Sequence, residues 1–259
     1  MQLCGVLLGM IFVLISSVQA QAAVEVRFKE GLARGFVVLQ TLDGDTIAHG
    51  DLAQVARDEG VTSHLILNFK DGSMYDETVK FSQRGHFEVL NYRLVQKGPV
   101  FTIPMDMTID RSSGKVQVRY TGENGKEKED SERFELPRDL ANGIIPILLK
   151  NIPSDAKKTT VSVVAATPKP RLVSLEISPE GEARFLAGGA SRKATHYRIK
   201  VEIGGLLGVL APLVGKQPQD SHAWVLDGDA PAFLRMEGPL FEGGPSWRIT
   251  QESPVWQGE

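Results

Sequence analysis

The chain has 259 residues, of which 42% are hydrophobic and 24% charged, and its formal net charge is −3. These values are typical of a globular protein and exclude collagen-like, disulfide-rich and strongly disordered chains. The slightly acidic balance also excludes a basic nucleic-acid-binding protein, because contacts to phosphates require a positive surface.

The first 22 residues have the pattern of a cleaved export signal. The first 20 contain no charged side chain, residues 6–15 form an apolar core, and Val18-Gln19-Ala20 and Ala20-Gln21-Ala22 both fit the small-x-small rule for signal peptidase. A membrane anchor is the alternative, but the apolar stretch is shorter than the roughly 20 residues that span a bilayer. We therefore predict a signal peptide at 1–22 and a mature protein in the periplasm or outside the cell, not integral to the membrane.

The cysteine content adds to this picture. Cys4 is the only cysteine and lies inside the predicted signal peptide. The mature chain would then contain no disulfide, no thiolate metal site and no cysteine nucleophile. An exported chain without disulfides favours a bacterial periplasm or cell surface.

Alternating apolar and polar residues dominate the rest of the chain. In 196–203 every second residue is apolar, and 115–121 has the same period. Because strand side chains alternate between two faces, these segments predict strands with one buried and one solvated face, as in antiparallel sheets. We expect strands near 24–29, 34–41, 45–52, 61–69, 73–83, 86–97, 101–110, 114–121, 127–134, 158–166, 171–178, 181–187, 192–203, 221–227, 230–237 and 246–251.

Turn-forming dipeptides separate the expected strands. Asp43-Gly44, Asp71-Gly72, Asn124-Gly125 and Asp227-Gly228 reach positive φ easily and close tight hairpins. Glu180-Gly181 is a weaker signal of the same kind, expected between the strands at 171–178 and 181–187. The pattern predicts a mainly β, antiparallel meander in which each strand is one hairpin away from the next.

Residues 136–153 depart from this pattern and are the best helix candidate. Pro137 suits a first helical turn and Pro153 ends the segment. Asn142-Gly143 and Pro146 favour two short helical pieces or one kinked helix over a continuous one. This element divides the mature chain into an N-terminal β-meander half at 23–155 and a C-terminal half at 156–259, either as separate units or as one continuous domain.

Residues 203–215 are the second departure, since all of them are uncharged and their apolar side chains follow a helical spacing. The segment is too short to span a bilayer. Burying one such side chain is worth roughly 1.5–3 kcal/mol, so we expect the segment to be buried. It is either a short helix that plugs the sheet, or a lid or wall over an apolar cavity, or a membrane contact. The candidate cavity residues are Leu206, Leu207, Val209, Leu210, Leu213, Val214 and, in the following strand, Trp224.

The sequence carries no motif for catalysis, a metal or a cofactor. None of the five histidines lies at a local metal-binding spacing, and His64 and His196 fall on the polar phase of strands. No nucleophile elbow and no phosphate-binding loop occur. We therefore expect no enzyme, no cofactor and no metal site, although a metal site assembled across strands cannot be detected from spacing.

The C-terminal strands resemble a known architecture. A strand at 194–203, a loop, a Trp-bearing strand at 222–226, a tight turn and an Ala-Pro-x-x-x-Arg strand at 230–235 resemble the closing part of exported bacterial proteins of unknown function. Those proteins are similar in architecture to the lipoprotein carriers LolA and LolB. The resemblance implies a curved antiparallel sheet, a half-open barrel of one lobe or two, with one or two short helical segments packed on its concave side. Some relatives bind acyl chains on this concave face.

These observations lead to three functional hypotheses. The first is an exported, non-catalytic binding or carrier protein for an apolar or amphiphilic, lipid-like molecule, because barrel mouths are common ligand sites. The second is a structural or interaction protein of the cell envelope with a filled core and a protein partner. The third is a hydrolase of cell-wall or polysaccharide material.

Overall fold

The computed structural model describes residues 23–58, 60–122, 124–187, 189–202 and 218–252. The predicted signal peptide at 1–22 and the apolar segment at 203–215 lie outside these ranges, so both stay predictions.

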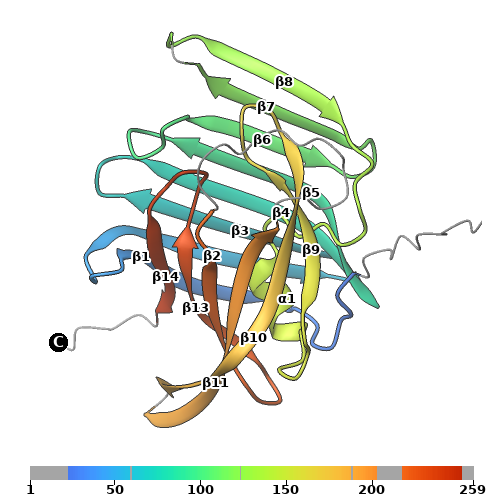
Figure 1. Cartoon of the computed structure of the whole chain (residues 1–259), viewed down its shortest axis with the longest axis vertical. Coiled ribbons are helices and arrows are strands. Elements are labelled where there is room, and N and C mark those ends of the chain that lie inside the picture. Colours follow the sequence, from blue (N-terminus) through green and yellow to red (C-terminus); the bar gives the residue numbers. More distant parts are fainter. Residues whose placement is uncertain (1–22, 59, 123, 188, 203–217, 253–259) are drawn as a thin grey trace, which may run out of the picture.

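The described residues form one antiparallel sheet of 14 strands and one short helix, α1 (Ile145–Asn151) (Figure 1). Strands that follow one another in sequence pair with each other, apart from β8 and β9, and β1 also pairs with β14. The strands are β1 (Ala33–Thr41), β2 (Thr46–Arg57), β3 (Gly60–Phe69), β4 (Met74–Arg84), β5 (His86–Lys97), β6 (Met105–Asp110), β7 (Lys115–Thr121), β8 (Glu127–Arg133), β9 (Thr159–Ala165), β10 (Arg171–Ala187), β11 (Ala190–Glu202), β12 (Ser221–Leu226), β13 (Ala232–Pro239) and β14 (Ser246–Glu252).

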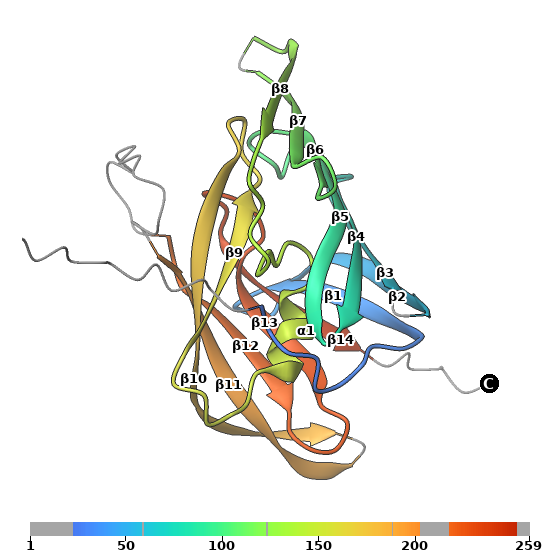
Figure 2. The same ribbon diagram turned by 90° about the vertical axis from the view of Figure 1, so that its right-hand side faces the viewer.

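The predicted fold class is confirmed. The sheet is a curved antiparallel meander, and Figure 2 shows its two wings diverging on either side of α1, which lies on the concave side. The edge strands β8 and β9 do not pair with each other in the described residues, so the sheet stays open. Residues of both predicted halves belong to this one sheet, because β1 and β14 are neighbours.

Two local predictions about strands were wrong. Glu180-Gly181 does not close a hairpin: β10 runs through it, and the register with β11 shifts between Pro179 and Gly181. Gly181 has φ 137°, a conformation that glycine adopts without strain and that lets the strand continue through a β-bulge. Residues 24–29 form no strand, only an isolated bridge between Glu25 and His86.

The concave face of the sheet carries the hydrophobic core. In β6, for example, Met105, Met107 and Ile109 are buried while the residues between them are partly exposed. This alternation follows from the strand geometry and explains why the period-2 pattern identified the strands. Burial on one face only also explains why an antiparallel sheet forms instead of a doubly covered parallel one.

The helix is much shorter than the candidate segment 136–153. It begins after Gly143, whose φ of 73° lies in the left-handed region, and Pro146 occupies its first turn. A Cβ atom at position 143 would lie 3.0–3.1 Å from side-chain atoms of Val79 and Tyr92, so the chain approaches the sheet closely there. Glycine is therefore required both by the backbone conformation and by the space, and it stops the helix from extending further toward its N-terminus.

The segment before α1 is attached to the outer edge of the sheet. The Asn142 side chain donates to Val164 O at 2.9 Å and accepts from Val164 N–H at 2.8 Å, so it pairs with β9 as a strand would. The Ala141 N–H donates to Ser162 O at 2.8 Å. These bonds cover part of an edge that would otherwise expose unpaired backbone groups, and they hold the N-terminal end of α1 in place.

Candidate functional site

A cavity of about 380 Å³ lies between α1 and the concave face of the sheet. This volume falls within the range of small-molecule sites, which is roughly 300–1,000 Å³. Its wall is formed by α1, by β1 to β4 and by β13 and β14, together with the loops next to them. Most of its side chains are apolar, among them Val37, Leu52, Leu65, Val79, Ile145, Ile147, Phe233, Met236, Leu240 and Ile249.

The alternation of the strands places these side chains in the cavity. Tyr75, Glu77 and Val79 of β4 are spaced by two residues and all line it, and Leu52 and Gln54 do the same in β2. On the opposite wall, the helix presents Ile145, Pro146 and Ile147. Because a helix of seven residues covers only part of the curved sheet, space remains beside it.

Hydrogen bonds at the C-terminal end of α1 anchor the helix to neighbouring elements. The Tyr197 hydroxyl of β11 donates to Ile152 O at 2.9 Å, and burial raises the pKa of this phenol to about 12. The Asn151 side chain donates to Ile147 O and accepts the N–H groups of Arg27 and Phe28 at 2.8 and 2.7 Å. The helix end is therefore fixed to both the sheet and the N-terminal arm, residues 24–30.

Strand β4 contributes one acidic side chain to the wall of the cavity, that of Glu77. It lies deep in the protein but is not fully covered, because it borders the cavity. The hydroxyls of Tyr75 and Tyr92 donate to its Oε1 at 3.0 and 2.8 Å. Burial raises the pKa of Glu77 above its usual value, while these two hydrogen bonds oppose the shift. The carboxyl group can therefore accept hydrogen bonds, and when protonated it can also donate one to a polar group in the cavity.

A second polar group lies where the N-terminal arm meets α1. Glu30 forms an ion pair with Lys150, and Gln54 Nε2 donates to Glu30 Oε2 at 2.8 Å. The side chains of Glu30 and Lys150 are only 8% and 18% exposed, so the pair is largely shielded from solvent. The Glu30 N–H donates to Gln83 Oε1 at 2.7 Å, and Gln83 Nε2 donates to Glu30 O at 3.1 Å, so the Gln83 side chain holds the backbone of Glu30. The cavity thus combines apolar walls with a small number of fixed polar groups, as is typical of ligand sites.

Of the residues predicted from the sequence to line a cavity, Trp224 is the one that the described ranges include. Leu206, Leu207, Val209, Leu210, Leu213 and Val214 are outside the described residues. Trp224 is described, but its neighbours Ala223 and Val225 point into the core, so alternation places Trp224 on the outer face of β12. There its ring stacks on His196 with centroids 4.7 Å apart, and the guanidinium carbon of Arg235 lies 4.1 Å from its centre.

Sequence reasoning did not identify the residues that line the cavity between α1 and the sheet. One signal was present: residues 145–147 belong to the segment that was identified as helical and was expected on the concave side. The polar lining residues were not recognisable, since Glu77, Glu30 and Lys150 look like ordinary surface charges in a linear sequence. They line one cavity only because the curved sheet, α1 and the N-terminal arm enclose a common space.

Comparison of the chain with protein-family models, with curated proteins and with solved structures finds no match. Among the described residues, no helix has the length and apolar character needed to cross a membrane.

Proposed function

We propose that this protein is an exported, non-catalytic binding or carrier protein for an apolar or amphiphilic, lipid-like molecule in the bacterial periplasm. The observation that carries the proposal is the cavity between α1 and the concave face of the sheet. An envelope protein with a filled core would need no such space. The cavity therefore favours a binding protein over a purely structural or interaction protein, whose defining surface would lie outside.

The lining of the cavity indicates what kind of ligand would fit. Burial of each CH₂ group contributes roughly 0.8 kcal/mol, so the apolar wall provides affinity for an acyl chain or a similar body. Glu77, Gln54 and the pair of Glu30 with Lys150 offer hydrogen bonds for a polar head group. A purely apolar ligand would shield these polar groups from solvent without bonding to them, which is unfavourable, whereas the polar end of an amphiphile can add a hydrogen bond to them.

The first test fills the cavity. Leu65→Trp adds bulk to a side chain that lines it, and Ile66→Trp makes the same kind of change at the next residue of β3, which points to the other face. A fluorescent fatty-acid probe should bind the wild type and Ile66→Trp equally and bind Leu65→Trp at least about tenfold more weakly, a loss of about 1.4 kcal/mol. Thermal melts identify variants that are merely unfolded.

A second measurement does not depend on a chosen probe. Mass spectrometry of purified wild-type protein should detect co-purifying lipids, and these should be depleted in Leu65→Trp. Protein that carries no lipid and also ignores the fatty-acid probe would contradict the proposal and favour the envelope interaction protein.

The export part of the proposal rests on the sequence of residues 1–22. Fractionation of expressing cells, followed by N-terminal sequencing of the recovered protein, tests it directly. A periplasmic protein that begins close to residue 21 or 23 is expected, since the two small-x-small sites end at Ala20 and Ala22. An intact N-terminus in the cytosolic fraction would contradict export.

A further inference from the structure

We propose that Glu180, His196 and His222 form a binding site for a divalent first-row transition metal on the outer face of the sheet. The three residues are called the histidine cluster below. It lies on the face of β12 opposite the core, so the proposal does not depend on the function of the cavity. The sequence had given no reason to expect a metal here, because the three residues come from three different strands.

The pairing of the strands brings the two imidazoles together. His196 of β11 is directly opposite Trp224 of β12, and His222 is directly opposite Arg198. His196 and His222 are therefore diagonal neighbours on one face of adjacent antiparallel strands, a position from which long side chains make contact. His196 Nε2 and His222 Nδ1 lie 2.9 Å apart, with one ring donating to the other.

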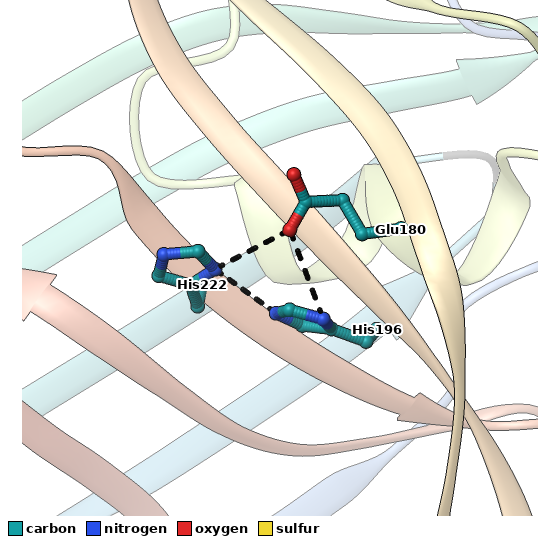
Figure 3. Close-up of side chains that lie close together, drawn as sticks. All are labelled: Glu180, His196 and His222. Atoms are coloured by element: carbon teal, nitrogen blue, oxygen red, sulfur yellow. Dashed lines mark hydrogen bonds and ion pairs between the residues drawn. The ribbon is translucent and has the colours of Figure 1, made fainter.

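The bulge in β10 provides the third ligand. Pro179 pairs with Tyr197 and Gly181 pairs with His196, so Glu180 is the extra residue between two consecutive pairs. A bulge changes the direction in which its side chain points, and here it directs the carboxylate toward the two imidazoles (Figure 3). Its Oε2 lies 3.9 Å from His222 Nδ1 and 3.9 Å from His196 Nδ1.

The geometry suits a metal after small side-chain movements. One ligand atom from each residue can be chosen so that all three lie within 4.8 Å of one another. A tetrahedral zinc ion with bonds of roughly 2.0–2.1 Å needs its ligand atoms about 3.3 Å apart. His222 Nδ1 lies 3.9 Å from Glu180 Oε2, and it lies 2.9 Å from His196 Nε2, while the other nitrogen of His196, Nδ1, faces the carboxylate at 3.9 Å. Side-chain rotations must therefore bring one His196 nitrogen and the carboxylate to the required separation. Metal binding would replace the hydrogen bond between the rings, with the donor ring moving its proton to its other nitrogen.

The surroundings hold the ligands in place and leave a route for the ion. The Trp224 ring is stacked on His196 at an interplanar angle of 10°, which restricts that imidazole. Arg198 Nε lies 3.0 Å from Glu180 Oε1, so this arginine occupies one carboxylate oxygen and leaves Oε2 for a metal. The side chains of His196 and His222 are 24% and 36% exposed, so an ion can reach them from solvent.

The charges around the cluster do not forbid a cation. Arg198 and Arg235 are positive, whereas Glu180, Asp220 and Glu237 are negative. Imidazole nitrogen combined with one carboxylate suits Zn²⁺, Cu²⁺ and Ni²⁺, while Ca²⁺ and Mg²⁺ prefer ligand sets made of oxygen. Three protein ligands also leave a fourth position for water, as in open zinc sites.

Calorimetry with Zn²⁺ on the purified, tag-free full-length protein tests the proposal. One equivalent should bind to the wild type, and His196→Ala and His222→Ala should abolish that binding. Glu180→Gln should weaken it at least about 10- to 100-fold, because loss of a ligand should cost no less than loss of an outer-shell partner of a ligand. His64→Ala is the matched control: His64 is also a partly exposed strand histidine, and it lies 3.0 Å from Asp76 in a two-residue pair.

A spectroscopic measurement on the wild type keeps the test independent of how the variants fold. Electron paramagnetic resonance of the protein with one equivalent of Cu²⁺ should show coupling to two imidazole nitrogens. Trp224 fluorescence should be quenched at the same stoichiometry, and Trp224→Phe should remove most of that quenching. Absence of binding, or Zn²⁺ binding that survives both histidine substitutions, would overturn the proposal. So would a Cu²⁺ spectrum with fewer than two nitrogens.

Discussion

The side-chain amide of Asn151 is predicted to attach the N-terminal arm to the helix, and Asn151→Leu tests this. The residue is 1% exposed, and its Oδ1 accepts the backbone N–H groups of Arg27 and Phe28 at 2.8 and 2.7 Å. Leucine has a similar size but no acceptor. The substitution therefore removes both hydrogen bonds without leaving a large hole, and it also removes the bond from Asn151 Nδ2 to Ile147 O.

The expected loss follows from these partners. A typical intramolecular hydrogen bond contributes about 0.5–1.5 kcal/mol, so two lost acceptor bonds predict a decrease of about 1–3 kcal/mol in the free energy of unfolding. Larger losses are not expected, because Arg27 and Phe28 are exposed or partly exposed and water can reach their N–H groups once the arm detaches. For a domain of this size the decrease corresponds to a fall of about 2–12 °C in melting temperature.

Urea denaturation followed by tryptophan fluorescence measures the loss, and hydrogen exchange locates it. The amides of residues 27 and 28 should lose protection in the variant, while those of β3 and β4 should not. Asn91→Leu is the matched control, since Asn91 is exposed and its replacement should change stability by no more than about 0.5 kcal/mol. If Asn151→Leu behaved like this control, the amide would not be what holds the arm, and the account of how the end of α1 is fixed would be wrong.

Three further predictions concern the cavity, the sheet and the histidine cluster. Because burial raises the folded-state pKa of Glu77, the free energy of unfolding should fall as pH rises from 4.5 through that pKa. Glu77→Gln carries no charge to bury, so urea titrations at pH 7 should show it to be more stable than the wild type. Gly50→Ala should lower the free energy of unfolding by more than about 3 kcal/mol in urea titrations, because the new Cβ would overlap the Ile66 backbone oxygen of β3. Gly35→Ala should be tolerated in the same assay, because the nearest atom to its new Cβ is 3.8 Å away. Zn²⁺ at about 100 times its dissociation constant should stabilise the wild type by about 2.7 kcal/mol, which is about 5–10 °C in a thermal melt, and should leave His222→Ala unchanged.

The extent of the strands could be predicted from the sequence because each strand has one buried face. The alternation in 115–121 reappears as β7, in which Val116 and Val118 are fully buried. The prediction failed where backbone conformation, not side-chain pattern, decides the outcome. Glu180-Gly181 has the composition of a turn, yet a positive φ at a glycine serves a bulge equally well.

Neither candidate site could be predicted, for a common physical reason. Linear spacing reveals ligands that share one helix or one strand, but here the partners come from different strands and depend on register. The cluster needs His196 opposite Trp224, so that His222 lies diagonally across, and it needs an extra residue in β10. A shift of one residue between β11 and β12 would move His222 to the core face and destroy the site.

The two proposed sites can be tested separately because they lie on opposite faces of the sheet. In β12, Ala223 and Val225 belong to the core, while His222 and Trp224 belong to the outer face. The cavity is lined by β13 and β14 and not by the three strands that carry the cluster. Leu65→Trp should therefore leave Zn²⁺ affinity unchanged, and His222→Ala should leave binding of the fatty-acid probe unchanged. A substitution that weakened the binding of both Zn²⁺ and the fatty-acid probe would indicate general loss of the fold instead of loss of one site.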